Sequence, residues 1–585
     1  MQRDGNGFLS SKKDFNGNTT AYVYDSRGRE LSRTEAQGKV EARTITTQWH
    51  PDFRQPTLIS EPGRQTSSSY DSATGALLTR SVKDLATNEV RTTTYSYQPG
   101  TAVLATVDGP RTDISDVTSY SYRTQDDPGA PMRYRKGDLS TVTNALGQVT
   151  EISEYDLLGN PLRITDPNGV ETVLTYDARQ RLKTLAVAGE TTGFDYDGVG
   201  QLTKVTQPDG FWIGYTYDPA HRLTDITDLA GNRIHYTLDA AGNRTAEEVY
   251  DPTNALRRSQ TRAYDALSRL KELRGGNGQV SAYGYDAEGN NTSDTVAGSY
   301  STARQYDALN RLFKSTDAAQ GITQYAYNKL DQLTSVTDPR NLVTRYTRNA
   351  FGEVTQLQSP DTGTTVSTYD SAGNLATRTD AKGQLASYSY DALNRLTQVV
   401  YTGGPTFTHT YDQGNFGKGR LTSMTDASGS TDWGYDPLGR VATRIQTVAG
   451  QTLMTSYAYN LGRLISVSLP SGHVIGYNWN GDRVGSLMLD GSLLASSFAW
   501  EPFGPVGGWM FANGEQDYRT YDLSGRMTGH SLGTIDYDTA DRISGLTHGG
   551  LSQLSGSKTC GYDSPGRLAG VDGSSAYAYN GLGQR

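Results

Sequence analysis

The feature that most constrains this chain is a sequence repeat with a period of 21 residues. A Tyr-Asp pair followed by a short turn and Arg-Leu (or Arg-Val) recurs as YDARQRL at Tyr176, YDPAHRL at Tyr217, YDALSRL at Tyr264, YDALNRL at Tyr306 and Tyr390, and YDPLGRV at Tyr435. From Tyr264 to Tyr411 the first position of the unit advances by 21 residues seven times in succession. A fixed period of this length predicts an architecture of equivalent stacked units rather than one compact core.

The local sequence of one unit predicts a β-hairpin. In residues 311–328 an extended stretch leads to the turn Asp317-Ala-Ala-Gln-Gly321, and a second stretch runs on to Tyr327. Asp favours the start of a turn because it bonds its own backbone, and Gly favours the end because it accepts a positive φ. The segments between turns have about six to seven residues, which suits strands and is too short for helices. Leu333 and Val336 are three residues apart, which indicates a bulge or a strand that begins after the leucine.

A ribbon of such hairpins has to curl. From Tyr155 onward the units predict roughly 40 strands, which at about 4.8 Å per strand make a ribbon roughly 190 Å long. Open twisted sheets rarely exceed about ten strands without curling or closing. The hydrophobic fraction is 35%, and 38 of the residues counted in it are tyrosines. We therefore predict an all-β fold, a long coiled antiparallel sheet around a partly hollow interior about 38 Å across.

Composition excludes several classes of protein. The net charge is −9, so no basic footprint for nucleic acid is present. The single cysteine, Cys560, excludes an internal disulfide framework and a cysteine zinc cluster. No apolar run approaches the 18 residues of a membrane span, and the start of the chain has no apolar stretch typical of a secretory signal peptide.

The YDxxGRL motif with its partner DxxG turn, repeated at about 21 residues, resembles the YD repeats of bacterial Rhs proteins, teneurins and the C components of insecticidal toxin complexes. The resemblance covers residues 151–585 as a regular shell segment and residues 1–150 as degenerate repeats, where WHPDFRQPTLISEPGR also looks like Rhs sequence. It implies a spiral β-sheet cocoon that often encloses a C-terminal toxin. The twin DPxG signature of the family's autoproteolytic core is absent, and no divergent effector follows the repeats.

This resemblance implies a function and partners. The expected function is a non-catalytic encapsulating scaffold of a toxin-delivery protein, secreted or at the surface of a bacterium, as a fragment or a specialised secretion substrate. The expected partners are flanking segments of the same protein and an enclosed toxin, and no cofactor or metal is expected. The alternative is a cell-surface adhesion module that binds carbohydrate or protein, because exposed Tyr, Trp and Arg suit such surfaces. Exposed strand edges at the ends of the ribbon predict self-association.

The repeated residues themselves are interpreted as structural. A structural contact between neighbouring hairpins has to recur every 21 residues, whereas a binding site does not, so Tyr-Asp and Arg are expected to join hairpins in a ladder. The positions assigned this role are Tyr176, Asp177, Tyr217, Asp218, Tyr264, Asp265, Tyr306, Asp307, Arg311, Tyr390, Asp391, Arg395, Tyr435 and Asp436.

One sequence motif matches the nucleophile motif of serine hydrolases. Residues 529–533 read GHSLG, a literal G-x-S-x-G, and Asp536, Asp538 and His548 follow Ser531 in the order of a catalytic triad. The motif functions only where a strand turns sharply into a helix. Here the repeat predicts a turn and another strand, so the chain is not expected to be an enzyme.

The remaining candidate sites are weaker. His50, His221, His235 and His409 are scattered without metal-ligand spacing and are expected to be satisfied surface or sheet residues. The segments 4–7 and 14–17 resemble pieces of calcium loops but lack a distal Glu. The glycine-rich segments 275–278 and 414–419 lack the Lys-Ser pair of a phosphate loop, and Cys560 is expected to be structural.

Overall fold

The computed structural model describes residues 1–129, 131–296, 298, 300–549, 556–563, 567–574 and 577–578. Within these residues the regular structure consists of 52 strands and no helix. The first half of the strands are β1 (Gln2–Arg3), β2 (Leu9–Lys13), β3 (Thr19–Tyr24), β4 (Glu30–Glu35), β5 (Arg43–Trp49), β6 (Pro56–Glu61), β7 (Arg64–Tyr70), β8 (Leu77–Asp84), β9 (Val90–Tyr97), β10 (Leu104–Asp108), β11 (Thr118–Tyr122), β12 (Leu139–Thr143), β13 (Val149–Tyr155), β14 (Pro161–Thr165), β15 (Glu171–Tyr176), β16 (Leu182–Val187), β17 (Glu190–Tyr196), β18 (Leu202–Thr206), β19 (Trp212–Tyr217), β20 (Leu223–Asp228), β21 (Arg233–Leu238), β22 (Arg244–Tyr250), β23 (Leu256–Tyr264), β24 (Leu270–Gly275), β25 (Val280–Tyr285) and β26 (Asn291–Val296). The second half are β27 (Tyr300–Tyr306), β28 (Leu312–Thr316), β29 (Ile322–Tyr327), β30 (Leu333–Thr337), β31 (Val343–Arg348), β32 (Val354–Ser359), β33 (Gly363–Tyr369), β34 (Leu375–Thr379), β35 (Leu385–Tyr390), β36 (Leu396–Tyr401), β37 (Thr406–Tyr411), β38 (Leu421–Asp426), β39 (Gly429–Tyr435), β40 (Val441–Val448), β41 (Gln451–Asn460), β42 (Arg463–Ser468), β43 (Val474–Asn480), β44 (Arg483–Leu489), β45 (Ser492–Trp500), β46 (Val506–Phe511), β47 (Gln516–Tyr521), β48 (Met527–His530), β49 (Gly533–Tyr537), β50 (Ile543–His548), β51 (Gly556–Tyr562) and β52 (Leu568–Val571).

Every strand pairs antiparallel with the next strand in the chain, so the molecule is one continuous meander of hairpins. Among the described residues β1 pairs only with β2, and β52 only with β51. The sheet is therefore not closed into a barrel. The all-β fold and the long coiled sheet predicted from the repeat are confirmed.

The offset between Leu333 and Val336 is a β-bulge. Tyr327 lies opposite Leu333, while Ala326 lies opposite Ser335, so Thr334 is an extra residue in β30. The same shift accompanies Tyr306 and Tyr390 in their hairpins. A bulge increases the local right-handed twist and bends the strand. Its recurrence in successive hairpins is a reason for the sheet to curl.

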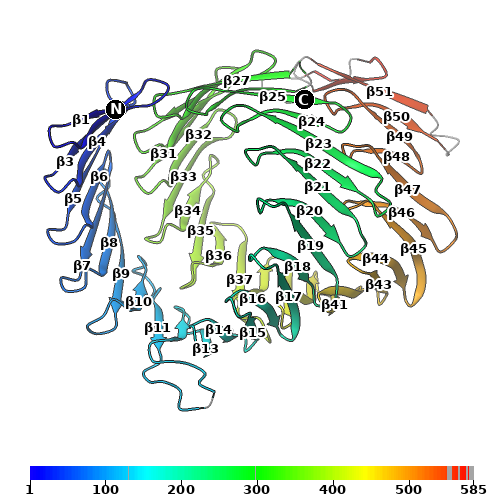
Figure 1. The fold of residues 1–585 in the computed structure, drawn as a ribbon, viewed down its shortest axis with the longest axis horizontal. Coiled ribbons are helices and arrows are strands. Elements are labelled where there is room, and N and C mark those ends of the chain that lie inside the picture. The colour runs from blue at the N-terminus through cyan, green and yellow to red at the C-terminus, as the bar shows by residue number, and fades with distance from the viewer. Residues whose placement is uncertain are drawn as a thin grey trace.

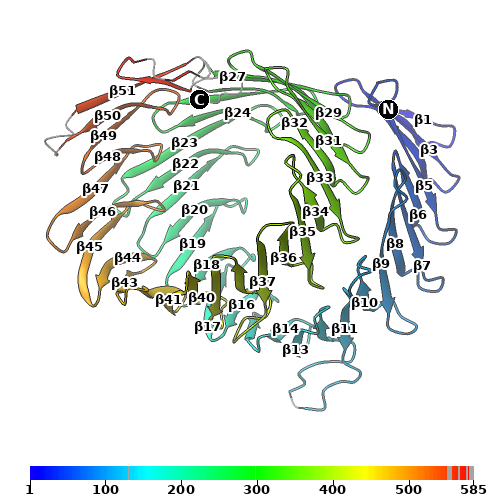
Figure 2. The ribbon, with the colours of Figure 1, turned by 180° about the vertical axis from the view of Figure 1, so that it is seen from behind.

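The sheet winds a little more than twice around one axis. Figure 1 shows the strands passing around a ring once from β1 to about β24 and then a second time beside the first circuit, and Figure 2 shows the same two circuits from behind. The turn after β2 meets the turn after β25, and the turn after β24 meets the turn after β47. About 24 strands at about 4.8 Å each give a circuit roughly 115 Å long, or roughly 37 Å across.

The two edges of the ribbon differ in their turns. We call the edge with the turns after odd-numbered strands the YD edge, because those turns follow the repeated tyrosines, such as Tyr306 at the end of β27. We call the edge with the turns after even-numbered strands the opposite edge. Both names refer to the single ribbon and therefore recur in each circuit.

Both faces of the sheet lack a thick apolar layer. Thirteen apolar residues of the described chain are buried, and of these Val249 is the most enclosed at 1% exposure. The solvent-accessible surface is 31491 Å², against about 20,000 Å² expected for a compact protein of this mass. An excess of about half is the signature of a single-layer wall rather than a filled globule.

Candidate functional site

The repeated Tyr-Asp-x-x-x-Arg unit builds a tight turn at the YD edge. In the turn after β27 the backbone N–H of Asp307 donates to the carbonyl of Arg311 at 2.9 Å, and the N–H of Asn310 donates to the carbonyl of Asp307 at 3.0 Å. Asn310 has a φ of +59°, where other repeats place glycine. The carboxylate of Asp307 accepts the N–H groups of Leu309 and Arg311 at 2.9 and 3.0 Å. The result is a type I turn followed by a left-handed residue, a common three-residue hairpin loop.

The arginine of the unit joins its own turn to the next repeat. Arg311 donates from Nε to Asp307 at 2.8 Å, and from Nη1 to the backbone carbonyl of Asn328 at 2.9 Å. Its guanidinium lies 4.9 Å from the ring centre of Tyr327. A planar guanidinium can bind a carboxylate edge-on while it stacks on an aromatic face. The same stacking, at 4.2–4.8 Å, joins Arg181 to Tyr196, Arg269 to Tyr285, Arg395 to Tyr411, Arg440 to Tyr459, Arg526 to Tyr537 and Arg542 to Tyr562.

The tyrosine of the unit reaches back to the preceding repeat. The hydroxyl of Tyr327 donates to the carbonyl of Leu312 at 2.8 Å, and that of Tyr306 donates to the carbonyl of Asn291 at 2.9 Å. Trp49 and Trp479 replace tyrosine in their repeats, and each donates from Nε1 to a carbonyl at 2.8 Å. Each repeat is thus bonded forward through its arginine and backward through its aromatic residue.

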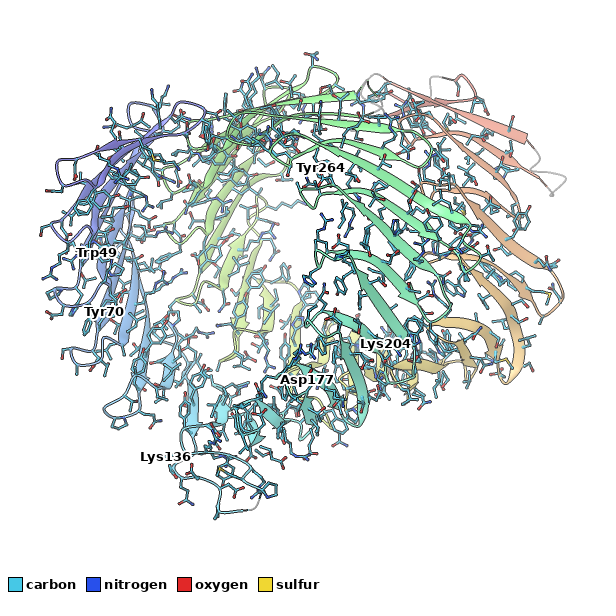
Figure 3. All side chains as sticks on the ribbon, in the orientation of Figure 1. Trp49, Tyr70, Lys136, Asp177, Lys204 and Tyr264 are labelled. Atoms are coloured by element: carbon cyan, nitrogen blue, oxygen red, sulfur yellow. The ribbon has the colours of Figure 1, made fainter. Side chains whose placement is uncertain are left out.

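The structure places all the repeat positions singled out from the sequence at the YD edge. Tyr264 lies at the end of β23 and Asp177 in the turn after β15, and both are labelled in Figure 3 with Trp49 and Tyr70. Asp177, Asp218, Asp265, Asp307, Asp391 and Asp436 each accept a hydrogen bond from an arginine Nε at 2.6–2.8 Å. Tyr217, Tyr264, Tyr306 and Tyr435 each donate to a carbonyl of the preceding repeat at 2.5–2.9 Å. Tyr176 and Tyr390 end equivalent strands without that bond.

Sequence reasoning named only two of the arginines that act in this way, Arg311 and Arg395. Arg181, Arg222 and Arg440 hold the aspartate of their own turn in the same manner. Their signal was present, since each lies four residues after the repeated aspartate. The contacts between the two circuits were not indicated by any comparable spacing in the sequence.

The opposite edge of one circuit docks on the YD edge of the next circuit. The partners are separated by between 242 and 288 residues in the sequence. The contacts across this seam include those of Phe15 and Asn16 with Glu288 and Asp286, Arg43 with Asp331, Asp84 with Ala350, Arg91 with Glu353, Arg111 with Asp391 and Asn394, Asn168 with Lys418, Glu190 with Arg440, Asp209 with Arg463, Gln279 with Ser524, and Tyr300 with Arg542.

Two polar residues of the seam are buried. Asp84 is 2% exposed, and its carboxylate accepts the backbone N–H of Ala350 at 2.7 Å. Arg111 donates to the carbonyl of Asp391 and to the side chain of Asn394 at 3.2 and 3.1 Å. The YD turn at Asp391 therefore bonds both to its neighbouring repeat and to the circuit beneath it.

The charge pairs shift pKa values in the direction expected for ion pairs. The hydrogen bond from Arg181 holds the pKa of Asp177 below its ordinary value, and Arg222 does the same for the pKa of Asp218. The backbone N–H of Arg269 is the main cause of the lowered pKa of Asp265. Burial raises the pKa of the Tyr217 phenol. The carboxylates of Asp177, Asp218 and Asp265 are thus held in their ionised form, each beside the arginine of its own turn.

These shifts predict a loss of stability in acid. The pKa of Asp251 falls from 3.8 to about 2, mainly through the hydroxyl of Thr253, and that of Asp127 falls to about 2 beside Arg133. A carboxyl whose folded pKa lies below its unfolded pKa contributes stability above the unfolded value and loses it as the pH falls through the folded value. The thermal midpoint, followed by circular dichroism, is expected to be level from pH 7 to 5 and to fall between about pH 4 and 2. A midpoint that rises as the pH is lowered from 5 to 3 would contradict this assignment.

The GHSLG segment forms a hairpin. Its His530 ends β48, Ser531 and Leu532 form the turn, and Gly533 begins β49. The hydroxyl of Ser531 donates to Asp517 at 2.5 Å. A strand follows the serine where a nucleophile elbow requires a helix. The predicted turn is confirmed, and the geometry of the elbow is not formed.

The substitution Ser531→Ala is therefore expected to cause no change in ester hydrolysis. The substitution removes one hydroxyl at a half-buried turn, so its effect on stability is expected to stay within about 0.5 kcal/mol. The measurement compares ester hydrolysis by the original protein and by Ser531→Ala. A rate in the original protein that this one substitution abolishes would restore the hydrolase interpretation.

The histidines serve different local roles. Nδ1 of His50 accepts two backbone N–H groups at 3.2 Å, and Nδ1 of His235 lies 2.8 Å from Asp225. His221 lies within hydrogen-bond distance of Gln201. The expectation of a satisfied residue is wrong for His409, whose Nδ1 is buried with no hydrogen-bond partner, because its strand faces Met424 at that position. No cluster of three metal-binding side chains occurs among the described residues.

The calcium-like and glycine-rich segments also have structural roles. A carboxylate oxygen of Asp4 accepts two backbone N–H groups of its own turn, and one of Asp14 accepts the backbone N–H of Asn18. The glycine-rich segments 275–278 and 414–419 lie at the seam, beside Ser524 and Asn168 respectively. Cys560 is half-buried in β51 with a free thiol.

Comparisons with known proteins address the fold and the family. The model of the RHS Repeat family matches this chain nine times, at residues 3–40, 134–171, 155–188, 176–211, 217–255, 306–340, 327–364, 369–406 and 417–452. The comparison with curated protein sequences finds no match. In the part of the chain that the structure describes, no helix is long and apolar enough to cross a membrane.

Solved structures share the coiled sheet. The crystal structure of TcdB2-TccC3 without its hypervariable C-terminal region matches with a TM-score of 0.72 at 11% identity, over 94% of this chain and 42% of that chain. The crystal structure of TcdB2-TccC3-TEV matches with a TM-score of 0.70 at 12% identity, over 96% and 42%. The Tc holotoxin pore of Photorhabdus luminescens, with a mutated TccC3, matches with a TM-score of 0.66 at 12% identity, over 95% and 42%. This chain therefore spans less than half the length of the structures it resembles. With its 21-residue units, its coiled hairpin sheet and these repeat matches, the chain belongs to the Rhs/YD-repeat family.

Proposed function

We propose that this chain is a non-catalytic segment of the wall of a shell that surrounds another polypeptide, a toxin or effector. The observation that carries the proposal is the single-layer sheet, wound into two bonded circuits with a surface of 31491 Å². A protein that exists to bind through one site does not need a curved wall of this extent. Its enclosed partner and flanking segments of the same protein would complete the shell.

The resemblance to toxin-complex structures supports this role. The solved structures with the same coiled sheet are those of TcdB2-TccC3 assemblies and of a Tc holotoxin pore. By this analogy the protein would be secreted or held at a bacterial surface. Its residues 1–150 would form a degenerate part of the wall and residues 151–585 the regular part.

Adhesion through the repeated residues has no comparable support. The guanidinium of Arg311 is occupied by Asp307, Tyr327 and the carbonyl of Asn328, and the Tyr306 hydroxyl is bonded to a backbone carbonyl. These side chains are committed to joining repeats. They are not free to stack on a sugar or to bind its hydroxyl groups.

Protection of an attached polypeptide tests the shell. An unstructured Gly/Ser-rich tail of 30 residues, with one site for a sequence-specific protease at its midpoint, is joined after Arg585. The control carries the same tail on an unrelated compact protein. A wall that surrounds the tail on its sides should slow cleavage relative to the control, because the protease can then reach the site only through the open ends of the coil. Equal cleavage rates in the two fusions would overturn the proposal.

A further inference from the structure

One repeat of the first circuit departs from the unit at three positions. The segment 238–244 reads LDAAGNR, so Leu238 stands in place of tyrosine, Asn243 in place of arginine and Arg244 in place of leucine. The turn is kept, because Asn243 donates to the carboxylate of Asp239 at 2.9 Å. Leu238 lies opposite Arg244, as the tyrosine and the leucine of a regular unit do. A smaller apolar side chain and a charged one therefore replace the ring and the leucine at this place on the face of the sheet.

A cavity of about 500 Å³ lies at this place. It is lined by three arginines, Arg222, Arg244 and Arg262, and by no acidic residue. Tyr264, which is labelled in Figure 3, also lines it and donates its hydroxyl to the carbonyl of Arg244 at 2.9 Å. The volume lies within the range of about 300–1,000 Å³ that is usual for ligand pockets.

The arginines of the cavity outnumber the carboxylates beside them. Arg222 is paired with Asp218 of its own turn at 2.7 Å. Within the described residues, Arg244 and Arg262 share Glu247 as their one ion-pair partner, at 3.3 and 3.5 Å. Nη1 of Arg262 is buried and makes no hydrogen bond in this part of the chain. One positive charge is thus left without a carboxylate, and one guanidinium donor is left without an acceptor.

The register of the strands brings these charges to one face. Tyr236 lies opposite Glu247, and Glu247 lies opposite Gln260 in the next strand. Arg262 follows Gln260 by two residues and so points to the same face. The guanidinium of Arg244 lies 3.5 Å from the ring centre of Tyr236, which is 7% exposed. Burial raises the pKa of the Tyr236 phenol, and the charges of Arg244 and Arg262 lower it, so both guanidinium groups lie near this one ring.

We propose that this cavity binds an oxyanion, a phosphate or a carboxylate group, between Arg244 and Arg262. A guanidinium presents parallel N–H donors that match two oxygens of either group. The ligand would supply the second negative charge and the acceptor that Arg262 lacks. Glu247 would compete with it for both arginines. As a site for carboxylates of an enclosed polypeptide, the cavity rests on the proposed function; as a site for a free phosphate ion, it does not.

The site lies on the face of the sheet and not at its free edge. On the YD side, every contact described for the seam comes from a turn or from the residue directly after it, as with Asp391 and Arg463. Glu247 lies three residues from the start of β22, and Arg262 lies two residues from the end of β23. A further circuit stacked on this edge would therefore contact the turns beside the cavity and not Glu247 or Arg262.

Calorimetric titration of the protein with two probes tests the site. The probes are inorganic phosphate and hexaglutamate, in chloride buffer at pH 7, and saturable binding of at least one is expected. Binding of hexaglutamate alone identifies carboxylates of a polypeptide as the ligand, and binding of phosphate alone identifies the free ion. Saturable binding of neither probe overturns the proposal. The protease test of the shell uses a fused tail and none of these arginines, so either proposal can fail without the other.

Variants of the arginines locate the binding. Arg244→Gln and Arg262→Gln each remove one cation and should weaken binding at least tenfold. Arg274→Gln is the matched control, since Arg274 lies opposite Thr261 and therefore on the other face from Arg262. It should bind the probe normally. Equal losses in Arg262→Gln and Arg274→Gln would show that the cavity is not the site.

A variant that gains affinity separates binding from misfolding. Glu247→Gln removes the charge that competes for Arg244 and Arg262, so it should tighten binding at least threefold. A damaged fold would not produce such a gain. Circular dichroism checks that each variant keeps its sheet. Unchanged or weaker binding by Glu247→Gln contradicts the assignment of the two arginines as the oxyanion site.

Discussion

Replacing Arg395 by alanine is expected to lower the free energy of local unfolding around β35–β38 by about 2–4 kcal/mol, because one guanidinium serves two carboxylates. Arg395 donates to Asp391 at 2.7 Å and to both oxygens of Asp412 at 3.0 and 2.5 Å. It also lies 4.4 Å from the ring centre of Tyr411. Its side chain is 18% exposed, so these bonds are only partly screened by water. The alanine variant loses the cation and leaves two carboxylates without their shared partner.

Hydrogen exchange measures this effect because it reports local opening. Neighbouring repeats contact only each other along the ribbon, so protection should be lost first near β35–β38. Arg395→Lys keeps the charge but loses the planar fork, and it should show a smaller loss. Arg179→Ala, at an exposed arginine, serves as the control and should stay within about 0.5 kcal/mol. Equal effects of Arg395→Ala and Arg179→Ala would contradict the role assigned to the repeated arginine.

Asp84→Ala is expected to open the seam between the circuits, at a cost of about 2–4 kcal/mol. The carboxylate of Asp84 accepts N–H groups from Ala86 and Thr87 in its own turn and from Ala350 in the next circuit, at 2.7, 3.2 and 2.7 Å. Both Asp84 and Ala350 are buried, at 2% and 6% exposure. Removing the acceptor leaves N–H groups unpaired where water has little access, and each such group costs about 1–3 kcal/mol.

A matched turn isolates the contribution of the seam. Asp380 also accepts two N–H groups of its own turn, from Lys382 and Gln384, both at 2.9 Å. It lies on the opposite edge of the second circuit, where no further circuit docks among the described residues. Asp380→Ala should therefore cost about 0.5–2 kcal/mol, by analogy with the loss of a helix cap. Only Asp84→Ala should increase exchange at two places far apart in sequence, near residues 84–90 and 349–353. Exchange confined to one of them would show that the seam adds no stability.

The structure within one repeat could be predicted from the sequence alone. The turn at Asp307, the bulge opposite Tyr327 and the hairpin that contains them depend on residues that lie within one period of each other. Their chemistry is local, since Asp bonds the N–H groups two and four residues ahead and a left-handed residue follows. Because the unit recurs every 21 residues, the same reasoning predicted a meander of hairpins, a coiled sheet and the Tyr-Asp-Arg positions that line its edge.

Which turns meet at the seam between the circuits depends on the tertiary structure and could not be predicted from the sequence. Asp84 and Asp380 are both aspartates that begin a turn on the opposite edge, and no sequence feature indicates that only Asp84 is covered by another circuit. The difference depends on how many strands complete one circuit, which is the sum of small twists and bends over about 24 strands. A slight change in the average twist would bring different turns together. That sum leaves Leu393 half-buried and the equivalent Leu267 exposed. Every repeat contributes to the sum, and no single repeat determines it.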